Sequence, residues 1–181
     1  MFHSNTEQLI DYWRSRRGAE ETPSRSAINP ADFAQLLPQV FMLGRLAPGQ
    51  YRVRLGGGFL ADLHGRELRH TDFLRLWEPA ARTPLQLALE AVRRHPEPLV
   101  IDAEARVGEG VMRMEVLVAP LRGPSGQVDR LIGLYQPTTP AAALQGGIVR
   151  ALAIRGISTT AESSDQFPRL RLAAVDGRHI A

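Results

Sequence analysis

Apolar and polar residues alternate along several short stretches of the chain, a pattern typical of β-strands with one buried face. In 51–55, Tyr51, Val53 and Leu55 alternate with two arginines. A short loop containing Gly49 joins this stretch to the preceding apolar run, so we expect an antiparallel hairpin. The five predicted strands are 40–46, 51–55, 99–107, 111–121 and 128–137.

Other stretches repeat their apolar residues at helical spacing. Near the N-terminus, Leu9, Ile10 and Trp13 form one apolar stripe, which predicts an amphipathic helix that ends near Gly18. Further helices are expected at 31–37, within 59–77 and at 84–95.

The order of these elements is two strands, several short helices, a longer helix and three more strands. It predicts an α+β fold in which helices inserted after the second strand cover one face of a five-stranded antiparallel sheet. The N-terminal amphipathic helix is added to this layer. We divide the chain into an N-terminal helical cap at 1–38, a core at 39–138, and a linker with a C-terminal extension at 139–181, which we expect to be partly mobile. Within that extension, 148–157 fits either a strand or a helical turn, and 170–180 fits a terminal hairpin or strand.

Several segments of the chain resemble a known family. They are YWRSRRG at 12–18, PSRSAINPADFAQLLPQVFML at 23–43, YRVRLGG and ADLHGREL within 51–68, FLRLW at 73–77, and APLRGPSGQVDRLIGLYQP at 119–137. Over about residues 10–138 the chain resembles a bacterial family of small stand-alone PAS-like proteins, known mostly from alphaproteobacteria. The resemblance implies a PAS-like fold and a regulatory or sensory module rather than an enzyme. It assigns no ligand to numbered positions.

The composition is that of a globular chain and excludes several chemistries. Of the 181 residues, 44% are hydrophobic and 23% charged. The absence of cysteine excludes disulfides, thiolate metal sites, a cysteine nucleophile and the cysteinyl adduct of a flavin. All 22 basic residues are arginine, which also excludes Schiff-base chemistry and a Walker lysine.

The charge and hydropathy patterns restrict the classes of binding partner and the cellular location that we expect. The net charge is only +3 and the arginines are mostly interleaved with acids, so we expect no nucleic acid partner. No apolar run approaches the roughly 18 residues that a membrane helix needs. The N-terminus lacks the pattern of a signal peptide. We therefore expect a cytoplasmic protein without membrane insertion.

The glycine stretch at Gly56–Gly58 raises an alternative function. With Ala61 it has the spacing G-x-G-x-x-A, a variant of the dinucleotide-binding fingerprint. That fingerprint needs one helix and a parallel strand within roughly 30 residues, whereas here the next predicted strand begins at Leu99. We therefore favour a structural role, in which the glycines let the strand turn sharply into a helix.

The five histidines do not form a metal-binding pattern. His64 and His70 lie six residues apart across a glycine, so we interpret them as surface or capping residues. His95 ends the long helix, where a haem-binding histidine lies in some PAS domains, but a capping role is favoured. We predict no metal and no cofactor, with haem and flavin both disfavoured.

One face of the predicted sheet and the helices above it gather apolar side chains. A filled core explains them, because burial of apolar surface is itself stabilising. A small-molecule cavity among the same residues is the alternative. The candidate pocket residues are Phe59, Leu63, Phe73, Leu76, Trp77, Leu85, Leu89, Met112, Met114 and Val116.

The N-terminal helix must bury its apolar stripe on its own sheet or on a partner. PAS-like domains often dimerise through such a helix, so the resemblance favours a homodimer. The candidate interface residues are Leu9, Tyr12 and Trp13.

These features favour a non-catalytic regulatory module. No kinase, cyclase or helix-turn-helix pattern is present, so we expect the protein to act by association with a signalling partner, with a small-molecule ligand as a further option. Carboxylates on the predicted strands alternate with arginines, which indicates an ion-pair surface rather than acid–base catalysis. Two other functions stay open: a small nucleotide-dependent enzyme using Gly56–Gly58, and a nucleic-acid binder using Arg14, Arg16, Arg17, Arg52 and Arg54.

Overall fold

The fold is built on one antiparallel sheet with helices on both faces. The computed structural model describes residues 1–18 and 20–160. Its sheet has six strands in the order β2-β1-β5-β4-β3-β6. Their bounds are β1 (Val40–Ala47), β2 (Gln50–Gly56), β3 (Leu99–Val107), β4 (Gly110–Arg122), β5 (Val128–Pro137) and β6 (Leu152–Thr159). All five predicted strands are confirmed, and β6 raises the expected count of five to six.

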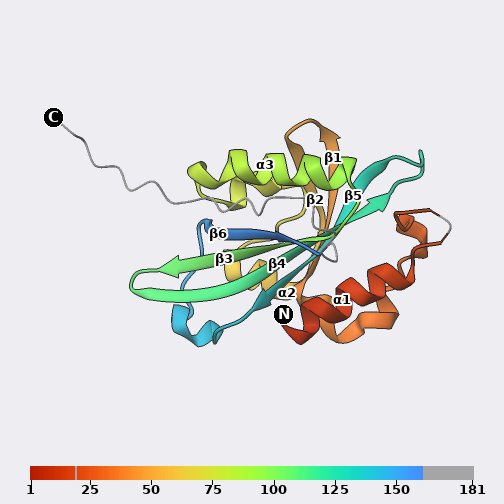
Figure 1. Ribbon diagram of the computed structural model, residues 1–181. Helices are drawn as coiled ribbons and strands as arrows, with labels where there is room; N and C mark the ends of the chain where they lie inside the picture. The colour runs from red at the N-terminus through yellow and green to blue at the C-terminus, as the bar shows by residue number, and fades with distance from the viewer. Residues whose placement is uncertain (19, 161–181) are drawn as a thin grey trace.

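The helices form two layers, one on each side of the sheet (Figure 1). The α-helices are α1 (Ser4–Ser15), α2 (Gly58–His64) and α3 (Pro79–Arg94). The 3₁₀ helices are η1 (Arg25–Ala27), η2 (Pro30–Gln39), η3 (Phe73–Leu76) and η4 (Ala141–Leu144). As the sequence predicts, α2, η3 and α3 are inserted between β2 and β3, and α1 precedes the sheet. In Figure 1, α3 lies across one face of the sheet and α1 lies against the other.

Two apolar cores lie on the two faces of the sheet. The helix-insert core fills the space between the sheet and α2, η3 and α3. The N-terminal core lies between the sheet and α1 with η2. Strand β4 serves both, because Met112, Met114 and Val116 face the first core and Leu117 and Ala119 face the second. This explains the almost uninterrupted apolar sequence in its second half.

The glycines after β2 have a structural role. A Cβ on Gly57 would lie 2.2 Å from the carbonyl oxygens of Leu37 and Pro38. The N–H of Gly57 donates to the carbonyl of Val40 at 2.8 Å. The chain therefore crosses the end of η2 at a distance that only glycine permits, and then enters α2. All pairings between the six strands are antiparallel, so the parallel strand of a dinucleotide fold is not among them.

Candidate functional site

The structure gathers the predicted pocket residues in one place. Nine of them belong to the helix-insert core, and Phe59 packs against it while partly buried. Eight of the nine side chains are at most 1% exposed, and Leu63 is 7% exposed. They come from α2, η3, α3 and β4, so the inserted helices position one half of the site and the sheet the other.

A series of rings runs through this core. Phe41 stacks on Phe73 with centroids 5.2 Å apart, and Phe73 meets Trp77 edge-on at 6.0 Å. On its other side, Phe41 meets Tyr135 edge-on at 5.5 Å, and Tyr135 meets the ring of His64 at 6.1 Å. The series therefore connects α2, through β5 and β1, to η3 and its C-cap residue Trp77.

Three of these rings carry buried polar atoms that have no hydrogen-bond partner among residues 1–18 and 20–160. They are Nε2 of His64, Nε1 of Trp77 and the hydroxyl of Tyr135. A buried donor or acceptor left unpaired costs about 1–3 kcal/mol, so native proteins rarely leave one without a reason. Three such atoms along one series of rings make this the candidate site of the molecule.

The hydrogen-bonding roles of these atoms follow from their surroundings. His64 Nδ1 lies 2.9 Å from the carbonyl oxygen of Val149. Because a carbonyl only accepts, Nδ1 carries the proton in the neutral ring and Nε2 is left as an acceptor. Trp77 Nε1 is a donor, and the Tyr135 hydroxyl can donate or accept.

Both titratable groups at the site are held neutral near pH 7. Burial lowers the pKa of His64, although its bond to Val149 opposes the shift. Burial raises the pKa of Tyr135 far above its ordinary value. The site therefore offers neutral donors and acceptors in an apolar setting, which suits a small uncharged molecule better than an ion.

The structure corrects the interpretation of His64 and places His95. His64 is not a surface residue: its side chain is 4% exposed and bonded to Val149. Its position directly after the buried Leu60 and Leu63 of α2 was the local signal for this. His95 caps the C-terminus of α3 and is exposed, away from the core. In the described part of the chain, no group of three or more potential metal ligands is found.

Two hollows lie on the surface, near the β3–β4 hairpin. Their volumes are about 330 and 450 Å³, and both are lined by Val107 and Gly108 of the β3–β4 hairpin. The first also includes Glu78, Arg106 and Arg150. None of the ten predicted pocket residues lines either hollow.

The predicted interface residues of α1 contact the chain's own sheet. Leu9 is 1% exposed and Trp13 is fully buried in the N-terminal core. Trp13 Nε1 donates to the carbonyl of Pro120 in β4 at 2.7 Å. These two side chains could reach a partner only if α1 left the sheet.

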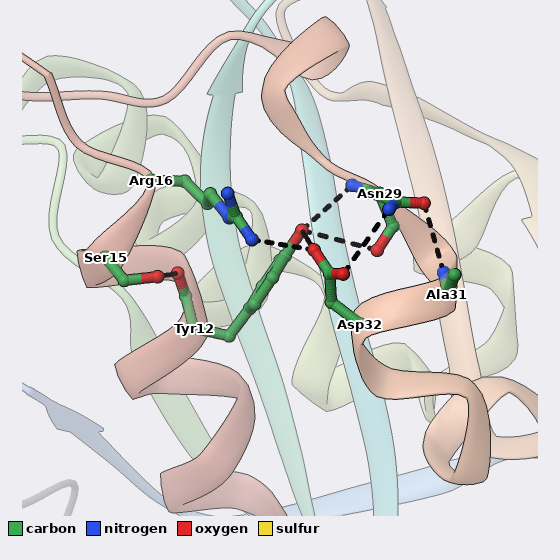
Figure 2. Close-up of polar contacts among 6 residues, drawn as sticks. All are labelled: Tyr12, Ser15, Arg16, Asn29, Ala31 and Asp32. Atoms are coloured by element: carbon green, nitrogen blue, oxygen red, sulfur yellow. Dashed lines mark hydrogen bonds and ion pairs between the residues drawn. The ribbon is translucent and has the colours of Figure 1, made fainter.

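Tyr12 lies at the edge of α1 in a polar cluster with η2. Figure 2 shows its hydroxyl between Asn29 and Asp32. The hydroxyl accepts from the N–H of Asn29 at 2.8 Å and donates to Asp32 at 3.2 Å. Arg16 binds the same carboxylate at 2.7 Å and lies over the Tyr12 ring. These hydrogen bonds and the ion pair connect the C-terminal end of α1 to the start of η2.

Comparisons with known proteins give the family and similar folds. A family model described as PAS domain matches residues 1–136, and no curated protein matches the chain. Similar solved structures include the PAS domain of Bordetella pertussis BvgS, at 16% identity over 64% of this chain and 90% of that chain, with a TM-score of 0.45. A LOV protein of Rhodobacter sphaeroides has 10% identity over 63% of this chain and 70% of that chain, with a TM-score of 0.46. A Light-Oxygen-Voltage domain characterised with a flavin analogue has 17% identity over 70% of this chain and 92% of that chain, with a TM-score of 0.47. Among the described residues, no helix has the length and hydropathy of a membrane span.

Proposed function

Because the chain belongs to the PAS domain family, whose model spans residues 1–136, we propose that it is a non-catalytic sensory module that acts by associating with another protein. The fold is that of a sensory domain. We also propose that a small neutral molecule binds in the helix-insert core. The observation that supports the ligand is a set of three buried polar atoms, on His64, Trp77 and Tyr135, that have no partner in the described part of the chain.

The contacts of these residues suggest how a ligand would change the rest of the molecule. The N–H of Val149 donates to the carbonyl of Leu63, and His64 donates back to Val149. Trp77 forms a parallel bridge with Leu152, the first residue of β6. The side chain of His64 and the backbone of Trp77 are therefore both bonded to the segment that leads into β6. A ligand that shifted them would shift that segment and the sheet edge after it.

The ligand chemistry follows from the donors and acceptors. A ligand beside Trp77 would need an acceptor, and one beside His64 would need a donor, whereas the Tyr135 hydroxyl could take either role. The aromatic series would contact its apolar part. A flavin held here would have no cysteine with which to form a covalent adduct, because the sequence contains none.

The replacement of Tyr135 by Phe tests the ligand. If a ligand pairs with the hydroxyl, Tyr135→Phe lowers the free energy of unfolding of the protein as purified from its cell by about 1–2 kcal/mol. Mass spectrometry and visible absorbance of the extract should then show a compound in the native protein that is depleted in the variant. Tyr51→Phe is the matched control, because its hydroxyl already donates to Glu90 at 2.5 Å. It should lower stability while the compound stays bound.

The absence of a ligand predicts a different result for Tyr135→Phe. If the hydroxyl has no partner, its removal relieves an unpaired buried group, and Tyr135→Phe raises the free energy of unfolding or leaves it unchanged. That result, with no compound in either extract, would reject the ligand. The homodimer and the cytoplasmic location stay predictions of the sequence.

A further inference from the structure

Arginines cluster on the sheet beside the region that α1 and η2 cover. Tyr51 and Val53 of β2 face the helix-insert core, so Arg52 points to the opposite face, that of α1. In β5, Ile132 belongs to the N-terminal core, which places Arg130 on the same face. Gly44 of β1 pairs with both Arg52 and Arg130, so the three positions form one row across β2, β1 and β5.

Arg54 lies over the middle of this row. The register between β1 and β2 shifts after Met42, which makes Arg54 the extra residue of a β-bulge. Its Nε lies 2.7 Å from the position that a Cβ of Gly44 would take. The missing side chain of Gly44 is therefore what lets the Arg54 side chain lie against the sheet.

A fourth arginine reaches the row from η1. Arg25 Nε lies 3.0 Å from the sulfur of Met42, which is two residues from Gly44 on the same face. Arg25, Arg52, Arg54 and Arg130 form what we call the arginine surface. The exposed Leu55 pairs with Met42 and adds apolar area to it.

Two acidic residues lie beside the arginine surface, one of which is Asp72, which forms a backbone bridge with Arg52. Arg130 pairs with Asp129 at 3.1 Å. Within residues 1–18 and 20–160, no carboxylate lies within 4.0 Å of the guanidinium nitrogens of Arg25, Arg52 or Arg54. By contrast, the arginines of α1 and its C-cap, together with Arg17, are paired with Asp11, Asp32 and Glu97.

We propose that the arginine surface binds a short acidic segment of a protein partner, an inference that rests on the proposed function in protein association. Guanidinium groups bind carboxylates through two parallel hydrogen bonds. Among the residues that the structure describes, three of these four arginines have no carboxylate within 4.0 Å. Adjacent strands lie about 4.8 Å apart, so Arg52 and Arg130 are separated by roughly 10 Å. That span fits two or three carboxylates of one peptide. A nucleic acid is not favoured, because the net charge of the chain is only +3.

A binding assay on the full chain tests the proposal. The probe is a fluorescein-labelled dodecapeptide with alternating Glu and Ser, and binding is followed by fluorescence anisotropy. The double substitution Arg52→Gln and Arg54→Gln should weaken binding about tenfold or more. The matched control removes the same charge elsewhere, at the exposed Arg113 and Arg150, and should change the affinity less than about twofold. A charge-reversed peptide, with Lys in place of each Glu, should not bind.

Three results would overturn the proposal. They are equal losses in the two double variants, no binding of the acidic peptide by the native chain, and tighter binding of a 12-nucleotide single-stranded DNA than of the peptide. Circular dichroism of each variant separates lost binding from lost structure. If the peptide fails to bind while Tyr135→Phe still depletes a bound compound, the arginine surface is rejected and the sensory function is retained.

Discussion

At the scale of single residues, Gly57 and Gly58 differ sharply although they are adjacent. A Cβ on Gly57 would overlap two backbone carbonyls of η2, whereas no atom lies within 4 Å of the Cβ position of Gly58. The sequence alone gives both glycines the same weight, because the close approach involves a segment 20 residues earlier.

We predict that Gly57→Ala lowers the free energy of unfolding by about 1–3 kcal/mol, because backbone atoms must move to admit the methyl group. Gly58→Ala, at the start of α2, should leave stability unchanged or raise it by up to about 1 kcal/mol, since alanine favours the helix. Urea unfolding followed by circular dichroism measures both. Similar losses in the two variants would contradict the assigned crossing.

His64 gives the molecule a dependence on pH. Its pKa is lowered in the folded protein by burial, so the unfolded chain takes up a proton more readily than the folded chain. Stability from the neutral ring is therefore full above about pH 6.5, the ordinary pKa of histidine, and falls as the pH is lowered.

We predict a loss of up to about 1.4 kcal/mol of unfolding free energy per pH unit below about pH 6.5, until the folded pKa is reached. His64→Asn keeps a donor for the Val149 carbonyl and should flatten this slope between pH 7.5 and pH 5.5. His95→Gln, at an exposed position, should retain it. Urea unfolding at several pH values measures the slope, and equal slopes in both variants would exclude His64 as its source.

At the scale of elements, the sequence predicted helix α1 correctly but could not say which surface the helix packs against. The apolar stripe predicted the helix, and the structure places that stripe on β4 and β5 of the same chain. A stripe has the same sequence whether it covers its own sheet or a neighbour's, so periodicity could not distinguish the two.

The substitution Trp13→Ala tests whether the apolar stripe of α1 packs on its own sheet or on a partner. We expect it to lower the free energy of unfolding by about 3–5 kcal/mol, because it removes a fully buried ring and its bond to Pro120. Tyr12→Phe, which removes only a hydroxyl at the edge of the helix, should cost about 1 kcal/mol. Urea unfolding and sedimentation velocity are measured together. A dimer that becomes a folded monomer of unchanged stability would instead assign the stripe to a partner.

The strand that the sequence left undecided, β6, lacks regular periodicity. In β6 the register shifts after Asp102 of β3, so Ile154 and Ile157 both pack on the helix-insert core although they are three residues apart. That spacing fits a helix as well as a bulged strand, which is why 148–157 allowed both. The predicted hairpin at 170–180 lies outside the described residues.

At the scale of the whole molecule, the fold was more predictable than the site. Alternation and helical spacing are local, and they identified five strands, the inserted helices and the ten residues that meet in the helix-insert core. The three polar atoms come from three separate elements, because His64 lies in α2, Trp77 at the C-cap of η3 and Tyr135 in β5. Likewise, the arginine surface needs Arg25, which reaches Met42 of β1 from η1, 17 residues earlier.

The sheet separates the two proposed binding regions. The aromatic series lies on the side of α3, and the arginine surface lies on the side of α1, with β1 and β5 contributing side chains to both. A compound and a peptide bound there would share no contact atoms, so neither would compete with the other. The compound and the peptide could then bind in either order. Binding of one would change the affinity for the other only through a change in the sheet between them.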